Sequence, residues 1–116
     1  MAYVDGFVIA VPKDKLDAYK KMARDFGPRW MALGATSYVE CVGDDTPYGD
    51  LTSFPRAVMA KDDEVVIFSW ITFPDKATRD AVNAKIMADD SMPPPEETPF
   101  DMKRMIFGGF ESFMQL

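Results

Sequence analysis

The stretch "YVDGFVIAVP", residues 3–12, decides how the rest of the chain is interpreted, because it has the composition of a central β-strand. β-Branched and aromatic residues dominate it, and Pro12 ends the run. Both of its alternating faces are largely apolar, which indicates a strand that is buried on two sides. Asp5 interrupts this pattern, and an aspartate inside a buried strand needs a partner, water or a proton.

A helix is predicted directly after this strand, in "KDKLDAYKKMARDFGPRWMALG". Its larger apolar residues recur at spacings of three and four and form one stripe: Leu16, Tyr19, Ala23, Phe26, Trp30 and Leu33. Asp14 is the expected N-cap, and Gly34 the expected C-terminal stop. Pro28 lies inside the pattern and predicts a kink or a break into two helices, because proline has no backbone N–H.

The remaining sequence predicts three more strands and one more helix. The strands lie in "ATSYVECV", "RAVMAKDDEVVIFSWITF" and "MIFGGFESFMQL", and Asp75 caps the second helix. Three consecutive prolines make residues 90–99 a stiff connector. The order strand, helix, strand, strand, helix, strand predicts a single α+β domain over residues 1–116. Its fold is ferredoxin-like, βαββαβ, with a four-stranded antiparallel sheet and both helices on one face.

The charge balance argues against polyanionic partners. Lysine and arginine number 13 against 19 acidic residues, which gives a net charge of -6 at pH 7. Binding to nucleic acid, including RNA, or to an anionic membrane surface is therefore not expected. A single cysteine forms no internal disulfide, and the longest apolar run, residues 65–74, is too short to cross a bilayer. These features predict a cytoplasmic protein.

The chain contains no histidine, and this limits its chemistry. Histidine is the most common general base and transition-metal ligand, so Ser–His and Cys–His catalysis are excluded and no metal site or cofactor is expected. Asp44, Asp45 and Asp50 offer oxygen ligands for Mg²⁺ or Ca²⁺ in the long loop of residues 43–55. Their spacing matches no EF-hand loop, however, and Gly-Asp-Asp is typical of a turn.

Asp5 and Arg56 are two of four candidates for residues that line a ligand pocket. Asp5 is the first choice for a functional carboxylate, and we expect a basic partner for it among Arg56, Lys103 and Arg104. Arg56 stands where a loop meets a strand. It either pairs with a ligand carboxylate or locks its own loop to an acid.

Glu40 and Trp70 are the other two candidates. Glu40 is adjacent to Cys41 on a strand, so the two side chains should point to opposite faces. Glu40 is interpreted either as a catalytic residue or as a solvent-facing or salt-bridged one, and Cys41 as a small buried apolar residue. Trp70 lies in the most apolar strand and serves as core, as an aromatic pocket wall, or as both.

Six blocks spread over the chain resemble a known family: "YVDGFVIAVPKDKLDAY", "YVECVGDD", "TSFPRAV", "EVVIFSWITFPD", "RDAVNAKIMAD" and "PFDMKRMIFGGFE". Together they are similar to the bacterial family known as domain of unknown function 1428. The resemblance implies membership of the dimeric α/β-barrel superfamily, in which two ferredoxin-like sheets close into one barrel. That superfamily includes cofactor-free monooxygenases, small isomerases, haem-degrading enzymes and ligand-binding modules. The haem-degrading relatives depend on a histidine, which this chain lacks.

Two functional hypotheses follow. The first is a cofactor-free oxygenase or isomerase that acts on a small apolar or aromatic compound in the barrel cleft. The second is a non-catalytic ligand-binding or stress-linked module that uses the same cavity. Both assume a homodimer, because the helices cover one sheet face while the strands look apolar on both.

Overall fold

The computed structural model describes residues 2–116 and places them in a four-stranded antiparallel sheet with helices packed against it. The main elements in chain order are β1 (Tyr3–Pro12), α1 (Leu16–Leu33), β2 (Ser37–Val42), α2 (Phe54–Ala57), β3 (Glu64–Phe73), α3 (Lys76–Met87) and β4 (Ile106–Glu111). Short 3-10 turns occupy Lys13–Lys15, Pro95–Glu97 and Met102–Arg104. The strand order β2-β3-β1-β4 confirms the predicted ferredoxin-like α+β fold, to which the four-residue helix α2 is an unpredicted addition.

β1 is an inner strand with a neighbour on each side. It pairs with β3 over its full length and with β4 over residues 3–8, antiparallel in both cases. Asp5 is opposite Ile71 on one side and Gly109 on the other. Because side chains alternate along a strand, this register fixes which side chains of all three strands share a face.

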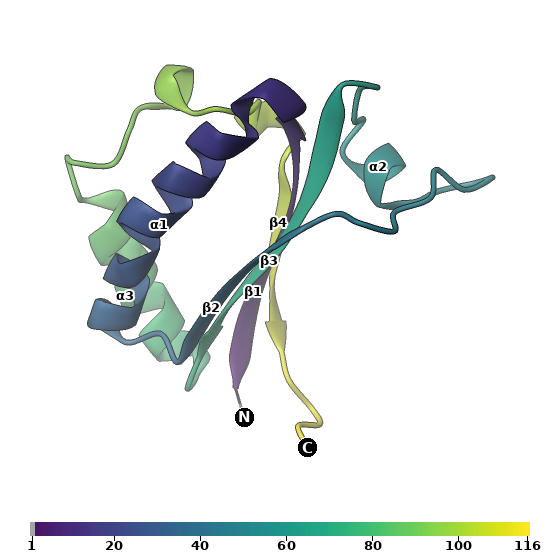
Figure 1. Cartoon of the computed structure of the whole chain (residues 1–116). Coiled ribbons are helices and arrows are strands. Elements are labelled where there is room, and N and C mark those ends of the chain that lie inside the picture. Colours follow the sequence, from purple (N-terminus) through teal and green to yellow (C-terminus); the bar gives the residue numbers. More distant parts are fainter. Residues whose placement is uncertain (1) are drawn as a thin grey trace.

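The main core lies between the sheet and the two long helices. Figure 1 shows α1 and α3 side by side on one face of the sheet. The buried apolar side chains of this layer come from both strands and helices: Ile9, Val11, Tyr19, Ile67, Ile71, Phe73, Val82 and Ile86. Burying a side chain of this size contributes about 1.5–3 kcal/mol, so this layer holds the helices in place.

The first long helix differs from its prediction at two points. α1 runs from Leu16 to Leu33 as one element with Pro28 inside it, so of the two predicted alternatives, a kink or a break into two helices, the break is wrong. Proline removes only one backbone hydrogen bond, and the packed helix continues past it. Asp14 lies in the 3-10 turn before the helix, and Lys15 takes the N-cap position without a side-chain bond. Gly34 ends the helix as expected, with φ 138° and its N–H bonded to the Trp30 carbonyl.

The opposite face of the sheet is covered at one end only. α2 lies on that side (Figure 1), and Val58 behind it is fully buried against Val8, Ala10 and Val66. The two predicted helices share one face as expected, and the unpredicted helix α2 covers this end of the other face. The rest of this surface, the open face, carries exposed apolar side chains: Phe68, Ile106 and Phe110.

A nearly buried ion pair joins β3 to the turn before β4. Arg104 donates from Nη1 and Nη2 to the two carboxylate oxygens of Glu64, each at 2.7 Å. The side chains are 13% and 3% exposed. Arg104 also donates to Asp101 and to the Met59 carbonyl. Hydrogen bonding from Arg104 is the main cause that lowers the pKa of Glu64 to about 2, so this pair persists well into acid.

We expect Glu64→Gln to lower the free energy of unfolding by about 2 kcal/mol at pH 7, because it leaves the Arg104 charge partly unpaired. The pKa of Glu64 is lower in the folded state, so its stabilisation is present above the ordinary glutamate pKa of 4.5 and is lost as the pH falls toward 2. Denaturant unfolding of both proteins between pH 2 and 7 measures this. Asp101→Asn, an exposed change on the same arginine, is the control, and equal losses from both variants would contradict the assignment.

Candidate functional site

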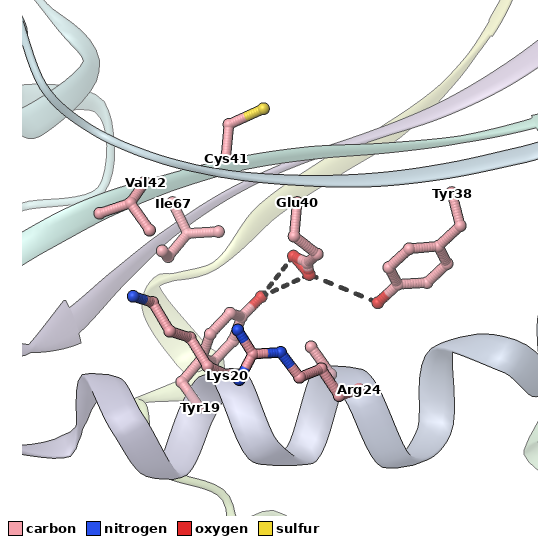
Figure 2. Close-up of a pocket in the computed structure, with 9 residues that line it drawn as sticks. Tyr19, Lys20, Arg24, Tyr38, Glu40, Cys41, Val42 and Ile67 are labelled. Carbon is pink, nitrogen blue, oxygen red and sulfur yellow. Dashed lines mark hydrogen bonds between the residues drawn. The ribbon is translucent and has the colours of Figure 1, made fainter.

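The Glu40 cleft lies between α1 and β2 on the helix side of the sheet. Its volume is about 310 Å³. Tyr19, Lys20 and Arg24 reach it from successive turns of α1, while Tyr38 and Glu40 reach it from β2 (Figure 2). The strand residues stand two apart and therefore share a face. On α1, Lys20 and Arg24 are four apart and share a helix face, with Tyr19 beside them at the edge of that face.

Glu40 is held by two phenols. The Tyr19 hydroxyl donates to Glu40 at 2.7 Å from Oε1 and 3.0 Å from Oε2, and the Tyr38 hydroxyl donates to Oε2 at 3.3 Å. Figure 2 shows these hydroxyls converging on the carboxylate from the helix and from the strand. Among residues 2–116 Glu40 has no salt-bridge partner, and its side chain is half-buried, in contrast to one of the two expectations from sequence. The strand places it on the covered face, where hydroxyl groups are its hydrogen-bond donors within the described chain.

Burial dominates the acid–base behaviour of this group. Desolvation raises the pKa of Glu40, and hydrogen bonds from Tyr19, Ser69 and Tyr38 oppose the rise only in part. Burial, followed by the nearby Glu40 charge, also raises the pKa of Tyr19 and of Tyr38. The arrangement therefore combines one carboxyl group shifted toward neutral pH with two phenols that keep their protons.

Glu40→Gln should change how stability depends on pH. The folded state holds the Glu40 proton more tightly than the unfolded state, so the wild type loses stability as the pH rises from 4.5 to the raised pKa. Glutamine does not titrate, so we expect the unfolding free energy of the variant to rise relative to that of the wild type across that window. Below the window the two free energies should be most similar. Tyr19→Phe removes a hydrogen bond that lowers this pKa and should extend the window upward. A stability difference that is flat with pH would contradict the shift.

The Asp5 cleft lies on the same side of the sheet, between α3 and the β1–β4 pair. Its volume is about 320 Å³. Asp5 is only 6% exposed, and Asn83 donates to its Oδ2 at 3.2 Å. Arg79 Nη1 lies 3.7 Å from Asp5 Oδ1, so the expected basic partner is present but is not one of the three expected residues.

Two of the three expected partners of Asp5, Arg104 and Arg56, are engaged elsewhere, and Lys103 lies in the 3-10 turn before β4. Asp5 lies opposite Gly109, whereas Arg104 precedes the start of β4 and pairs with Glu64. Arg56 lies in α2 and donates to the carbonyls of Tyr48 and Gly49 at 2.9 and 3.0 Å, with its guanidinium 3.8 Å from the Tyr48 ring centre. It therefore locks its loop to backbone oxygens rather than to an acid.

The side chains of Trp70 and Cys41 lie on the face of the sheet opposite to the carboxylates of Glu40 and Asp5. Trp70 is opposite Gly6 in register, so it shares the open face, where its ring lies 5.6 Å from that of Phe68. Figure 2 shows Cys41 pointing away from Glu40, as predicted, and its side chain is half-buried rather than buried in this chain. The four candidates thus separate into Asp5 and Glu40 in two clefts, Trp70 on the open face and Arg56 in the short helix α2.

Several residues of these sites were not singled out from the sequence. Tyr38 is two residues before Glu40, and Arg79 and Asn83 are four apart on a helix, so both pairs share a face by simple periodicity. Those spacings were available as a signal. The packing of Tyr19 against β2 depends on the position and orientation of α1 on the sheet, and the periodicity of the sequence does not predict these.

Within residues 2–116, no cluster of three or more cysteine or acidic side chains is arranged so that it could hold a metal ion. Asp44 and Asp45 follow β2 directly, with Asp50 beyond them, in the loop between β2 and α2. Across the same described part of the chain, no helix is both long and apolar enough to cross a membrane.

Comparison with known proteins agrees with this architecture. A dimeric ferredoxin-like protein from an uncultured marine organism, solved by crystallography, is similar with a TM-score of 0.58 and 11% sequence identity, over 100% of both chains. That likeness establishes a ferredoxin-like α+β fold. The chain belongs to the family described as Protein of unknown function (DUF1428), whose model matches residues 2–102, as the sequence resemblance implied.

The curated relatives are similar over nearly their whole length. The Uncharacterized protein YbaA of Escherichia coli strain K12 is 52% identical over 115 residues, which is 98% of each chain. The protein of the same name from Shigella flexneri matches with the same values. The family relationship therefore spans both clefts.

Proposed function

We propose that the protein binds a small carbonyl compound in the Glu40 cleft and moves a proton on it, as a cofactor-free isomerase or oxygenase does in its first step. The observation that supports this is the half-buried Glu40 carboxyl, whose pKa is raised and whose hydrogen-bond partners are two phenols. Groups with shifted pKa values in clefts are enriched at functional sites. A carboxyl group that titrates closer to neutral pH is suited to general acid–base work.

The chemical step assigns one role to each group. Glu40 as carboxylate takes a proton from the carbon beside the carbonyl. The electron pair of that C–H bond forms a double bond to the carbonyl carbon, and the π pair of the carbonyl moves onto its oxygen. As Glu40 becomes neutral it attracts the phenol hydrogens less, so Tyr19 or Tyr38 is free to donate to the new oxyanion. Return of the proton to a different atom completes an isomerisation.

Two cations give the cleft a preference for anionic substrates. Lys20 and Arg24 line its outer side on α1, facing β2 across the opening (Figure 2). Ala23, Val42 and Ile67 contribute apolar surface beside them. A ligand with a carboxylate at one end and an apolar body therefore matches the lining.

We expect the wild type to accelerate deuterium uptake at the carbon beside the carbonyl of phenylpyruvate, followed by proton NMR in D₂O. Glu40→Gln should reduce the enzymatic rate at least about 100-fold, the usual contribution of a general base. Glu111→Gln, which alters an exposed strand glutamate, should retain the wild-type rate. Equal rates for wild type and Glu40→Gln would overturn the catalytic proposal.

A non-catalytic ligand-binding module is the alternative function. It is favoured by the fact that both phenol hydrogens already point at Glu40, which makes the cluster complete without a substrate. A phenylpyruvate-induced rise in melting temperature that needs Glu40, without any deuterium uptake, would favour this alternative.

We also propose that the functional unit is a homodimer closed through the open face. Phe68, Ile106 and Phe110 are exposed there, and Phe110 retains 63% of its surface. Apolar patches of this kind on a sheet are typical of association surfaces. The similar marine protein is itself dimeric.

Light scattering should give twice the chain mass of 13.0 kDa at micromolar concentration. Phe110→Glu places a charge on the open face and should shift the protein toward monomer without unfolding it, because the residue is exposed in one chain. Phe113→Glu changes an equally apolar residue beyond β4 and serves as the comparison. A wild type of single-chain mass would contradict the proposal.

A further inference from the structure

We propose that the Asp5 cleft is a second ligand site, which binds a small apolar molecule through a protonated amine placed against the Asp5 carboxylate. This cleft is separate from the Glu40 cleft, and it is lined by β1, β4, α3 and the C-terminal half of α1. Its size of about 320 Å³ is at the lower end of the range for ligand pockets, enough for one ring with a short side chain.

The walls of the Asp5 cleft are apolar and aromatic. Phe7, Trp30, Ile86, Met87 and Phe107 contribute most of this lining. Phe7 and Phe107 are stacked with ring centres 6.5 Å apart, one on β1 and the other on β4. Aromatic faces attract cations as well as apolar groups, so this lining suits an organic cation better than a hydrated ion.

The Asp5 carboxylate has hydrogen-bonding capacity to spare. Within the described residues 2–116, Asn83 provides its one side-chain hydrogen bond, to Oδ2. Arg79 Nη1 is 3.7 Å from Oδ1, which is an ion pair but longer than a hydrogen bond. A carboxylate offers about four acceptor positions, and an ammonium group supplies up to three donors. Asp5 also places a charge in an otherwise apolar strand, where a buried carboxylate requires a partner to compensate it.

The local charge balance favours a cation over an anion. Arg79 is shared between two acids, because its Nε also lies 3.2 Å from Asp80 Oδ1, in a geometry that is an ion pair without a hydrogen bond. Its Nη2 donates to the Tyr3 hydroxyl at 2.9 Å, and its guanidinium lies 4.7 Å from the centre of that ring. Because the contact between Arg79 and Asp5 is long, at 3.7 Å, the guanidinium offsets the Asp5 charge only in part, and a ligand amine would complete its neutralisation.

The backbone around Arg79 keeps this arrangement in place. A Cβ atom at Gly109 would overlap the Tyr3 hydroxyl and Arg79 Nη2, so glycine allows both side chains to lie flat on β4. With Arg79 fixed toward Tyr3 and Asp80, no side chain among residues 2–116 donates a hydrogen bond to Oδ1 of Asp5, which Arg79 approaches only to 3.7 Å. A purely structural role for Asp5, in which it fastens α3 to β1, accounts for the Asn83 contact but not for the unfilled acceptor beside an apolar cleft.

The test compares three probes with the same phenyl body: phenethylamine, 2-phenylethanol and 3-phenylpropionate. Binding to the full chain is measured by amide chemical shifts in two-dimensional NMR. We expect saturable binding of phenethylamine, with shifts centred on Phe7, Asn83 and Phe107, at least about tenfold tighter than either of the other probes. No saturation by phenethylamine up to about 10 mM, or an equal or tighter affinity for the alcohol or the acid, would overturn the proposal.

Matched variants separate the site from general charge effects. Asp5→Asn should weaken phenethylamine at least about tenfold, whereas Asp80→Asn, the same change on the other acid of Arg79, should alter affinity less than about threefold because Asp80 lies outside the cleft. If Asp5→Asn does not fold, Phe107→Ala tests the aromatic wall instead, since Phe107 is largely exposed and its loss spares the core. Retained affinity in Asp5→Asn or in Phe107→Ala contradicts the site. Glu40→Gln should bind phenethylamine as the wild type does, which keeps this test independent of the proposed reaction.

Discussion

The double pairing of β1, with β3 on one side and β4 on the other, is the constraint on which the rest of the molecule depends. A slip of one residue in either ladder would move Asp5 to the open face and bring Gly6 under the helices. The register also fixes Trp70 opposite Gly6 and therefore away from both clefts. The helices pack on this sheet because Ile9 and Val11, which point to the face opposite Gly6, form part of the core beneath them.

Three acidic side chains on this sheet show how neighbours decide what a carboxylate does. Glu64 meets a guanidinium through two short bonds and becomes a fixed anion with a pKa of about 2. Glu40 meets the hydroxyls of two tyrosines and a serine, and its pKa rises because these neutral donors do not make up for lost water. Asp5 has one amide donor and a distant, shared arginine. The first environment fixes the carboxylate by a bidentate ion pair, and the other two hold it without one.

The sequence was sufficient for the fold because its strongest signals were local and consistent. Strand runs rich in β-branched and aromatic residues, Asp75 as an N-cap and Gly34 as a helix stop all agree with the structure. Asp14 was wrong as the N-cap and no break occurs at Pro28, because tertiary contacts at a packed helix outweigh one cap or one missing hydrogen bond. α2 was missed because four residues are too few to show a helical period.

The candidate site was predictable only in part. Asp5 and Glu40 stood out as charges in strands, and both line clefts. Their partners did not stand out, because Tyr19, Arg79 and Asn83 come from helices whose placement on the sheet is set by packing over long sequence separations. The alternation rule that separated Glu40 from Cys41 held, whereas no rule of this kind predicts which turn of a helix meets which strand.

The two tryptophans are intrinsic fluorescence probes placed on opposite faces of the sheet. Trp30 belongs to the helix layer and lines the Asp5 cleft, while Trp70 looks out from the uncovered side of the sheet. Emission from Trp30 is sensitive to a ligand in the Asp5 cleft, and emission from Trp70 is sensitive to a partner that covers the open face. Replacing either one with phenylalanine leaves a single indole, so ligand binding in the Asp5 cleft and association through the open face can be measured in separate single-tryptophan variants.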